Sequence, residues 1–103
     1  MYKIAFYVTA EHLEELKTAL FTAGAGHIGN YDHCCWQTKG TGQFRPLAES
    51  NPYLGEPEQL SRISEYLVEM VCRDEYIREV VEVLKAQHPY ENPAYQVWKI
   101  EDF

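Results

Sequence analysis

The order of apolar and polar side chains predicts a strand followed by a helix at the start of the chain. Residues 2–9 begin by alternating polar and apolar side chains and are rich in aromatic and branched residues, which is typical of a strand. The apolar residues that follow recur at helical spacing on one face: Leu13, Leu16, Ala19, Leu20 and Ala23. We expect Thr9 to be the N-cap of this helix and Gly24 to end it, because glycine adopts the left-handed conformation at little cost.

The segment after this helix predicts a glycine-rich loop and then a β-hairpin. Residues 24–30 contain three glycines and are predicted to form the loop. Residues 31–39 are predicted to form a strand. A tight turn at Gly40-Thr41-Gly42 is then expected to lead into a second short strand over residues 43–46.

The second half of the chain predicts a long loop, a long strand, a helix and a closing strand. Proline and glycine residues indicate a loop over residues 47–60, and renewed alternation indicates a strand over residues 61–73. Asp74 is the expected N-cap of a helix. The apolar face of that helix consists of Ile77, Val80, Val81 and Leu84. Pro89 is expected to end it, because proline disfavours helical geometry in the preceding residue, and residues 94–100 alternate as a last strand.

The order of these elements indicates an α+β fold, a ferredoxin-like βαβ-βαβ sandwich with an extra β-hairpin and a long loop. The length of 103 residues corresponds to a single domain, residues 1–103, with one modest core. Hydrophobic residues make up 46% of the chain and charged residues 24%, a balance that excludes intrinsic disorder.

Charge and cysteine content exclude several classes of partner. The formal net charge is -7 and no basic cluster offsets it, so we expect no binding to nucleic acid. The longest apolar run near the start, residues 4–8, is far too short to span a membrane. Three cysteines without the spacing of a disulfide framework favour a reducing, cytoplasmic location.

The glycine-rich loop matches the dinucleotide-binding fingerprint as a string, because Gly24, Gly26 and Gly29 have the spacing GxGxxG. In the true motif the glycines leave a strand and open a helix, whose N-terminus meets the pyrophosphate. Here the glycines leave a helix and enter a predicted strand. The spacing is therefore interpreted as a helix C-cap followed by a turn that needs positive φ angles.

Four potential soft metal ligands lie close together in sequence: His27, His33, Cys34 and Cys35. On a strand, His33 and Cys35 share one face and Cys34 takes the other, so one face offers two ligands and a third would come from His27 or His88. Zinc and copper accept such ligands. The alternative is that the cysteines are free thiols that pack as small apolar residues, as is expected of Cys72.

The segment His88-Pro89-Tyr90-Glu91-Asn92-Pro93 predicts a rigid elbow between the second helix and the last strand. A histidine and a glutamate held at one rigid corner could bind a ligand or coordinate a cation. The alternative is a well-capped connection in which His88 satisfies carbonyl groups of the last helical turn.

Several of these segments, taken together and in this order, resemble a known family. They are residues 23–31, Cys34, residues 40–42, residues 44–46, residues 51–53, Gly55, residues 88–91 and residues 93–95. The series resembles the small insert domain of the Nif-three-like family of dinuclear-metal-centre hexameric proteins, over nearly the whole chain. The elbow also looks like the corresponding segment of the CutA divalent-cation tolerance proteins, which share a ferredoxin-like fold with the PII signal proteins.

The resemblance implies a PII/CutA-like domain that forms trimers through its sheets. It does not imply the dinuclear metal site, because the ligands of that site lie in two flanking halves that this chain does not match. The family's usual cysteine-serine-aromatic step appears here as Cys34-Cys35-Trp36, which adds a thiol and slightly favours soft-metal or redox chemistry.

The leading hypothesis is a non-enzymatic, oligomeric module that binds or senses a small ligand or a divalent metal ion, with zinc or copper as the candidate cofactor. The candidate ligand-binding residues are His27, Asn30, Tyr31, Tyr90 and Glu91. The candidate metal ligands are His27, Cys34 and His88. The ligand is expected to lie between subunits, where the loop over residues 47–60 responds to it.

The alternative hypothesis is a structural or protein-interaction module that trimerises or caps a partner protein. Trp36 and Trp98 would then be interface anchors. A hydrolase that acts through metal-bound water ranks last, because it needs three placed ligands that the sequence does not show.

Overall fold

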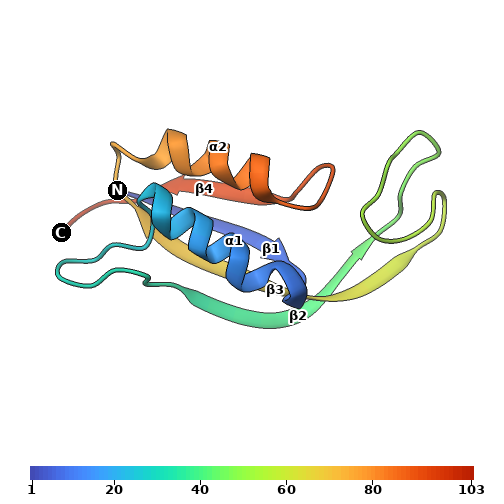
Figure 1. Ribbon diagram of the computed structural model, residues 1–103, viewed down its shortest axis with the longest axis horizontal. Helices are drawn as coiled ribbons and strands as arrows, with labels where there is room; N and C mark the ends of the chain where they lie inside the picture. The colour runs from blue at the N-terminus through green and yellow to red at the C-terminus, as the bar shows by residue number, and fades with distance from the viewer.

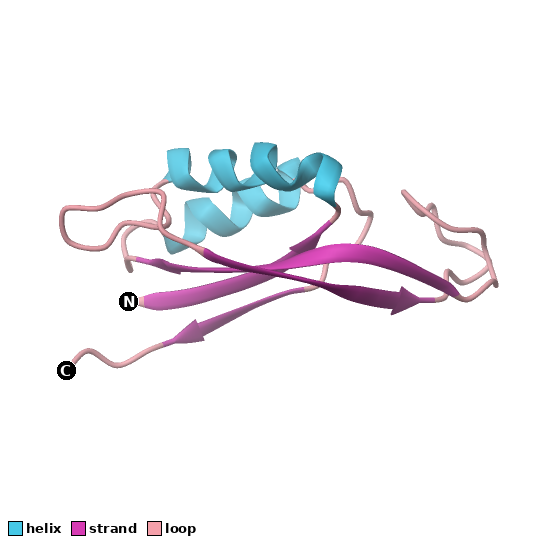
Figure 2. Ribbon diagram, turned by 90° about the horizontal axis from the view of Figure 1, so that it is seen from below, coloured by secondary structure: helices cyan, strands magenta, loops and turns pink.

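A computed structural model describes residues 1–103, in which two helices and four strands form two layers. The elements are β1 (Tyr2–Val8), α1 (Ala10–Ala23), β2 (Trp36–Phe44), β3 (Ser61–Cys72), α2 (Ile77–Gln87) and β4 (Tyr95–Lys99). The strands form one antiparallel sheet in the order β2-β3-β1-β4. Both helices lie on one face of this sheet and leave the other face open (Figure 2). This is the ferredoxin-like arrangement, so the predicted fold class is confirmed.

The core lies between the sheet and the two helices. Alternation along β1 and β3 turns one set of apolar side chains toward the helices, and these side chains are buried. They are Ile4, Phe6, Val8, Val68, Met70 and Cys72. The helices contribute Leu13, Leu16, Leu20, Ile77, Val80 and Leu84. Cys72 is therefore a core residue as expected, and burial raises the pKa of its thiol to about 11.

Both helices end as predicted and α1 also begins as predicted, but α2 begins later than expected. Gly24 has a φ of 119°, and its N–H bonds back to α1 carbonyls. Thr9 is the N-cap residue of α1, yet its buried hydroxyl makes no capping hydrogen bond. The prediction of Asp74 as N-cap of α2 is wrong, because that helix begins at Ile77 after Tyr76. The Asp74 carboxylate instead forms an ion pair with the N-terminal amine.

The predicted hairpin with a turn at residues 40–42 is wrong. The chain runs through these positions as the single strand β2, which pairs with β3 from Trp36 opposite Glu69 to Phe44 opposite Ser61. Gly42 serves packing instead of a turn: a Cβ atom there would lie 2.0 Å from Glu65 Oε1. The true hairpin is β2–β3, and residues 45–60 form its loop, where a loop was predicted.

The molecule is elongated, with extents of 46 × 24 × 23 Å. The β2–β3 hairpin projects beyond the helices, so its loop lies at one end of the molecule (Figure 1). The elbow between α2 and β4 lies toward that same end of the molecule, whereas the glycine-rich loop lies at the opposite end (Figure 1). Neither helix is long and apolar enough to cross a membrane.

Candidate functional site: a cavity between the hairpin loop and the elbow

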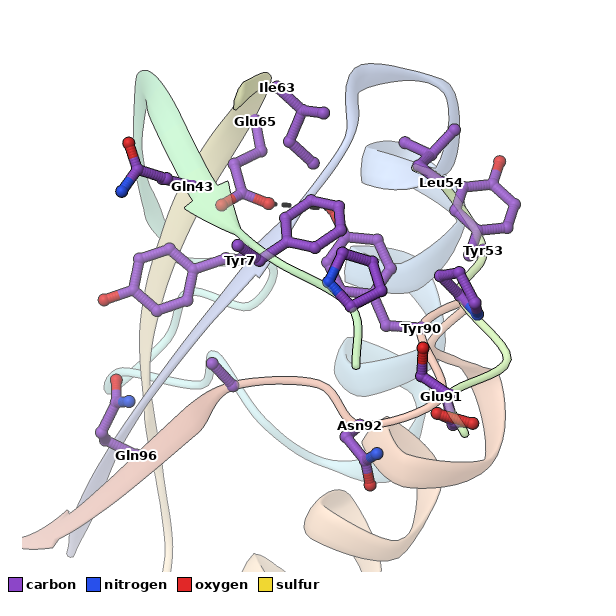
Figure 3. A pocket seen from close by; sticks show the side chains of 15 residues that line it. Tyr7, Gln43, Tyr53, Leu54, Ile63, Glu65, Tyr90, Glu91, Asn92 and Gln96 are labelled. Atoms are coloured by element: carbon purple, nitrogen blue, oxygen red, sulfur yellow. Dashed lines mark hydrogen bonds between the residues drawn. The ribbon is translucent and has the colours of Figure 1, made fainter. Parts of the chain in front are cut away.

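A cavity of about 560 Å³ lies where the hairpin loop and the elbow approach the ends of β1 and β3. Its walls come from four parts of the chain that are far apart in sequence: β1, residues 43–54, β3 and residues 90–96 (Figure 3). The lining residues are Tyr7, Gln43, Phe44, Pro46, Ser50, Pro52, Tyr53, Leu54, Ile63, Glu65, Tyr90, Glu91, Asn92, Ala94 and Gln96. Aromatic and polar side chains make up most of this set, and no lysine, arginine or histidine belongs to it.

Tyr90 and Glu65 form the central polar pair of the cavity. The Tyr90 hydroxyl donates a hydrogen bond of 2.8 Å to Glu65 Oε2 (Figure 3). Burial raises the pKa of the Tyr90 phenol far above its ordinary value, and the neighbouring Glu65 carboxylate raises it further. Tyr90 therefore keeps its proton and donates this hydrogen bond, and Glu65 accepts it.

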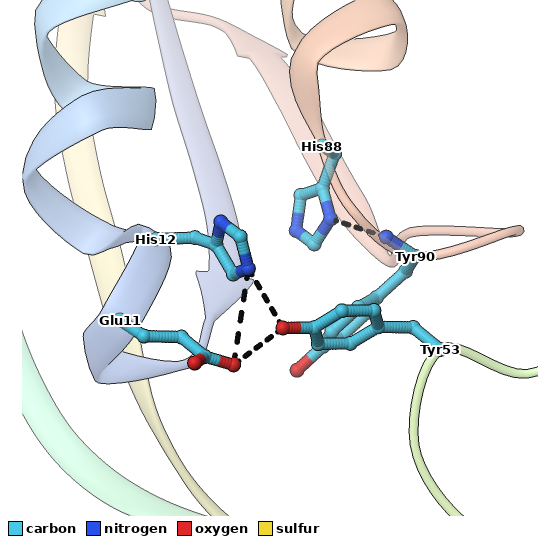
Figure 4. Close-up of polar contacts among 5 residues, drawn as sticks. All are labelled: Glu11, His12, Tyr53, His88 and Tyr90. Carbon is cyan, nitrogen blue, oxygen red and sulfur yellow. Dashed lines mark hydrogen bonds and ion pairs between the residues drawn. The ribbon is translucent and has the colours of Figure 1, made fainter.

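His88 holds the elbow against β1. One ring nitrogen, Nδ1, accepts a hydrogen bond of 3.1 Å from the Tyr90 backbone N–H (Figure 4). The other, Nε2, lies 2.6 Å from the Tyr7 carbonyl oxygen, to which it must donate. Burial lowers the pKa of His88, so the ring is the neutral Nε2–H tautomer. Both ring nitrogens of His88 therefore form hydrogen bonds within the fold.

The hairpin loop is tied to the rest of the molecule at two points. The Glu91 carboxylate accepts a hydrogen bond of 2.9 Å from the Asn51 backbone N–H. The Tyr53 hydroxyl donates to Glu11 and lies 2.7 Å from His12 Nε2, both on α1 (Figure 4). The hydrogen bond to Glu11 raises the pKa of Tyr53. These contacts close the cavity on the loop side.

The sequence-predicted site residues divide between the two ends of the sheet. Tyr90 and Glu91, two of the predicted ligand-binding residues, line the cavity. His27 and Asn30 belong to the glycine-rich loop at the opposite end, and Tyr31 and the predicted metal ligand Cys34 follow it before β2 begins.

The separation follows from the register of the sheet. The Gly26 backbone N–H bonds to the Val71 carbonyl, and Val71 pairs with Lys3 near the start of β1. His88 bonds to Tyr7, four residues further along that strand, which corresponds to roughly 13 Å. One copy of the chain therefore does not bring His27 and Cys34 together with His88.

No group of three histidine, cysteine, aspartate or glutamate side chains in the chain is arranged to hold a metal ion. Cys34 and Cys35 are half-buried free thiols. His88 would have to give up a hydrogen bond before it could coordinate a metal. The predicted set of His27, Cys34 and His88 is not assembled within one copy.

The glycine-rich loop has the backbone that the turn interpretation requires. Gly24, Gly26 and Gly29 all have positive φ angles. At Gly26 a Cβ atom would lie 2.6 Å from the Phe21 ring, so this position also needs glycine for close packing. Ile28 and Tyr31 pair through two backbone hydrogen bonds and close an exposed turn.

Sequence reasoning missed most of the cavity. Tyr7, Glu65 and Gln96 lie on regular strands, where alternation says only which face a side chain occupies. Tyr53 lies in a loop whose path the sequence does not specify. One signal was present: Gly42 in the middle of a strand indicates that a neighbouring group needs its space, and that group is the Glu65 carboxylate.

Comparison with known proteins gives relatives over almost the whole chain. No family model matches. A protein called GTP cyclohydrolase 1 type 2 homolog from Halalkalibacterium halodurans is 37% identical over 100 residues, which is 97% of this chain and 27% of that protein. The Mycobacterium leprae and Bacillus subtilis proteins of the same name are 40% and 38% identical over 98 and 99 residues. The chain therefore spans about a quarter of the length of the curated relatives it matches.

Solved structures agree with these relatives. A Bacillus cereus protein related to NIF3 superimposes with a TM-score of 0.82 at 38% identity, over 98% of this chain and 26% of that one. Pyrococcus horikoshii CutA superimposes with a TM-score of 0.72 at 16% identity, over 100% of this chain and 87% of its own. The likeness to CutA shows the fold alone. The chain is thus a homologue of one segment of the Nif-three-like (NIF3-related) proteins, and that segment has the CutA-like fold.

Proposed function

We propose that the chain is a non-enzymatic, oligomeric PII/CutA-like module of the cytoplasm that binds a small molecule in the cavity between the hairpin loop and the elbow. The observation that carries the proposal is the cavity itself. Its volume of about 560 Å³ is within the range of small-molecule sites, and its lining combines apolar walls with a few fixed polar groups. The proposal keeps Tyr90 and Glu91 as binding residues and adds Tyr7, Tyr53 and Glu65.

The hairpin loop is the element that would respond to the ligand. It contributes the wall formed by Ser50, Pro52, Tyr53 and Leu54, and two side-chain contacts hold it in place, those of Glu91 and Tyr53. A ligand in the cavity would touch this loop and the elbow at once. Binding would therefore favour the closed position of the loop, which is how a sensing module reports occupancy.

Catalysis is not part of the proposal. The name of the relatives refers to a GTP cyclohydrolase, but the cavity offers no lysine, arginine or histidine to a triphosphate. The buried His88 is occupied by two hydrogen bonds and is not free to move protons. Zinc or copper at His27 and Cys34 would need a third ligand from another copy of the chain, because His88 lies at the far end of the sheet.

The test is native mass spectrometry of protein purified without added metal, followed by removal of any bound small molecule and its return. We expect a trimer that carries a small molecule. Ala94→Trp places a large ring in the cavity and should abolish binding, whereas Thr18→Trp on the exposed face of α1 should retain it. A wild-type trimer that captures no small molecule from a metabolite extract would contradict the proposal.

A second candidate function, a protein-interaction module, is favoured by the exposed tryptophans. Trp36 is 70% exposed and Trp98 is 47% exposed, and both lie on the sheet face that no helix covers. Large aromatic side chains at this exposure are typical anchors of interfaces. If Trp36→Ala and Trp98→Ala break the trimer but leave ligand capture unchanged, the tryptophans serve assembly alone. A trimer that persists in both variants would contradict this role.

A further inference from the structure

We propose that the cavity selects an organic cation, an alkylated amine with an apolar body, over neutral and anionic molecules. This inference rests on the proposed function, since it names the class of ligand that the cavity takes. Three features of the lining support it: two carboxylates without a cationic partner, aromatic faces around them, and the absence of any basic side chain.

The negative charge of the cavity is not compensated within the fold. Glu65 and Glu91 both line the cavity, and neither forms an ion pair, whereas other carboxylates of the chain pair with Lys3 or Lys17. Glu65 accepts one hydrogen bond at Oε2, and Glu91 accepts only from the Asn51 N–H. A carboxylate offers about four acceptor sites, so both retain capacity for a donor or a cation.

Aromatic rings supply the second half of a cation site. Tyr53 and Tyr90 have ring centroids 6.1 Å apart with an interplanar angle of 30°, and Tyr7 and Phe44 also line the cavity. Ring faces attract alkylated ammonium groups through their quadrupole while they bury the methyl groups. The Tyr90 hydroxyl donates to Glu65, which fixes this ring beside one of the two carboxylates.

Other ligand classes fit this lining less well. Phosphate and carboxylate groups would meet Glu65 and Glu91 without a basic side chain to offset the repulsion. A bare divalent ion would need three or more ligands in one place, and no such group exists in the chain. The formal net charge of -7 also raises the local concentration of cations around the molecule.

The test compares three probes of the same shape by NMR titration of the ¹⁵N-labelled protein: choline, the neutral 3,3-dimethylbutan-1-ol and the anionic 3,3-dimethylbutanoate. We expect choline to shift the amide signals of Tyr53, Tyr90 and Glu91, with a Kd at least about tenfold lower than that of the alcohol. The anion should produce no shift at these positions.

Charge variants separate a local effect from the overall charge. Glu65→Gln and Glu91→Gln keep side-chain acceptors and should each weaken choline binding by about tenfold. Glu15→Gln removes the same charge from the exposed face of α1 and should leave the Kd unchanged. If the alcohol binds as tightly as choline, the cavity is a small-molecule site but the inference of a cation is wrong. If choline shifts no cavity signal, the inference is also overturned, and ligand capture by mass spectrometry decides the proposed function separately.

Discussion

At the scale of single residues, His88 shows how far a side chain's role depends on the rest of the fold. Its sequence position predicts a metal ligand or a cap for the last turn of α2. In the structure it bonds to the carbonyl of Tyr7, a residue 81 positions away, and to the N–H of Tyr90. The ring therefore joins the elbow to β1, and this role depends on its neutral form.

Acidification should destabilise the fold through His88. Burial holds the pKa of His88 below its ordinary value of 6.5. Between that value and the folded-state pKa, the unfolded chain binds a proton that the folded chain does not, so the free energy of unfolding decreases as pH falls. Urea unfolding from about pH 7.5 to about pH 5.5 should show this decrease, and His88→Gln should make it smaller.

A matched control for the pH effect is His27→Gln, because His27 is half-buried at the other end of the sheet. This variant should lose stability with falling pH as the unsubstituted chain does. If His88→Gln kept the full pH dependence, the neutral His88 ring would not be its source.

Gly42 and Gly40 form a matched pair for a test of packing around Glu65. Gly42→Ala should lower the free energy of unfolding by about 1 kcal/mol, because its Cβ atom displaces the Glu65 carboxylate and breaks the bond to Tyr90. Gly40→Ala meets no atom within 4 Å and should change stability by less than about 0.5 kcal/mol. Chemical denaturation of both variants measures the difference, and equal losses would show that the carboxylate moves aside without cost.

At the scale of elements, periodicity predicted the helices and the long strand but not the path of the middle segment. β3 and both helices lie within a few residues of their predicted ranges, because each buries one continuous apolar stripe. The predicted turn at Gly40 and Gly42 is wrong, since sequence alone does not separate a glycine that bends the chain from one that makes space, as Gly42 does for Glu65. The path of residues 36–44 is set by the pairing of β2 with β3 over nine residues, whose partners are distant in sequence.

The loop over residues 45–60 should depend on Glu91 for its position. Glu91→Ala removes the acceptor of the Asn51 N–H, so hydrogen exchange of this amide should become about tenfold faster. Glu91→Gln keeps a carbonyl oxygen at the same distance and should show a smaller increase. NMR-detected exchange gives the rates, and an unchanged Asn51 rate in Glu91→Ala would mean that other contacts hold the loop.

At the scale of the whole molecule, the sheet has one covered and one open face. Trp36 pairs with Glu69 on β3, and Trp98 pairs with Lys3 on β1. Both tryptophans therefore lie on the face of the sheet that is opposite the helices. The alternative hypothesis from the sequence makes them interface anchors, and in a single copy both side chains are exposed. An interface between copies depends on the surfaces of several chains. The pattern of apolar and polar residues in one chain therefore does not define it.

Assembly through the open face should change the environment of both tryptophans. In the single-tryptophan variants Trp36→Phe and Trp98→Phe, the remaining indole should emit at longer wavelength on dilution to monomer, because it becomes exposed to water. Fluorescence and sedimentation measured on the same dilution series should change together. Constant emission through dissociation would place the interface elsewhere.

The strand order has a further consequence, for the time course of folding. The inner strand β1 lies between β3 and β4, and its partners on β3 are between 58 positions away, at Val8 and Tyr66, and 70 positions away, at Tyr2 and Cys72. During synthesis its buried side chains Ile4, Phe6 and Val8 have only α1 to pack against until β3 has emerged from the ribosome. Contacts this distant slow folding and leave an apolar strand open to aggregation meanwhile. The nascent chain is therefore most prone to aggregation after β1 has been synthesised and before β3 has emerged from the ribosome.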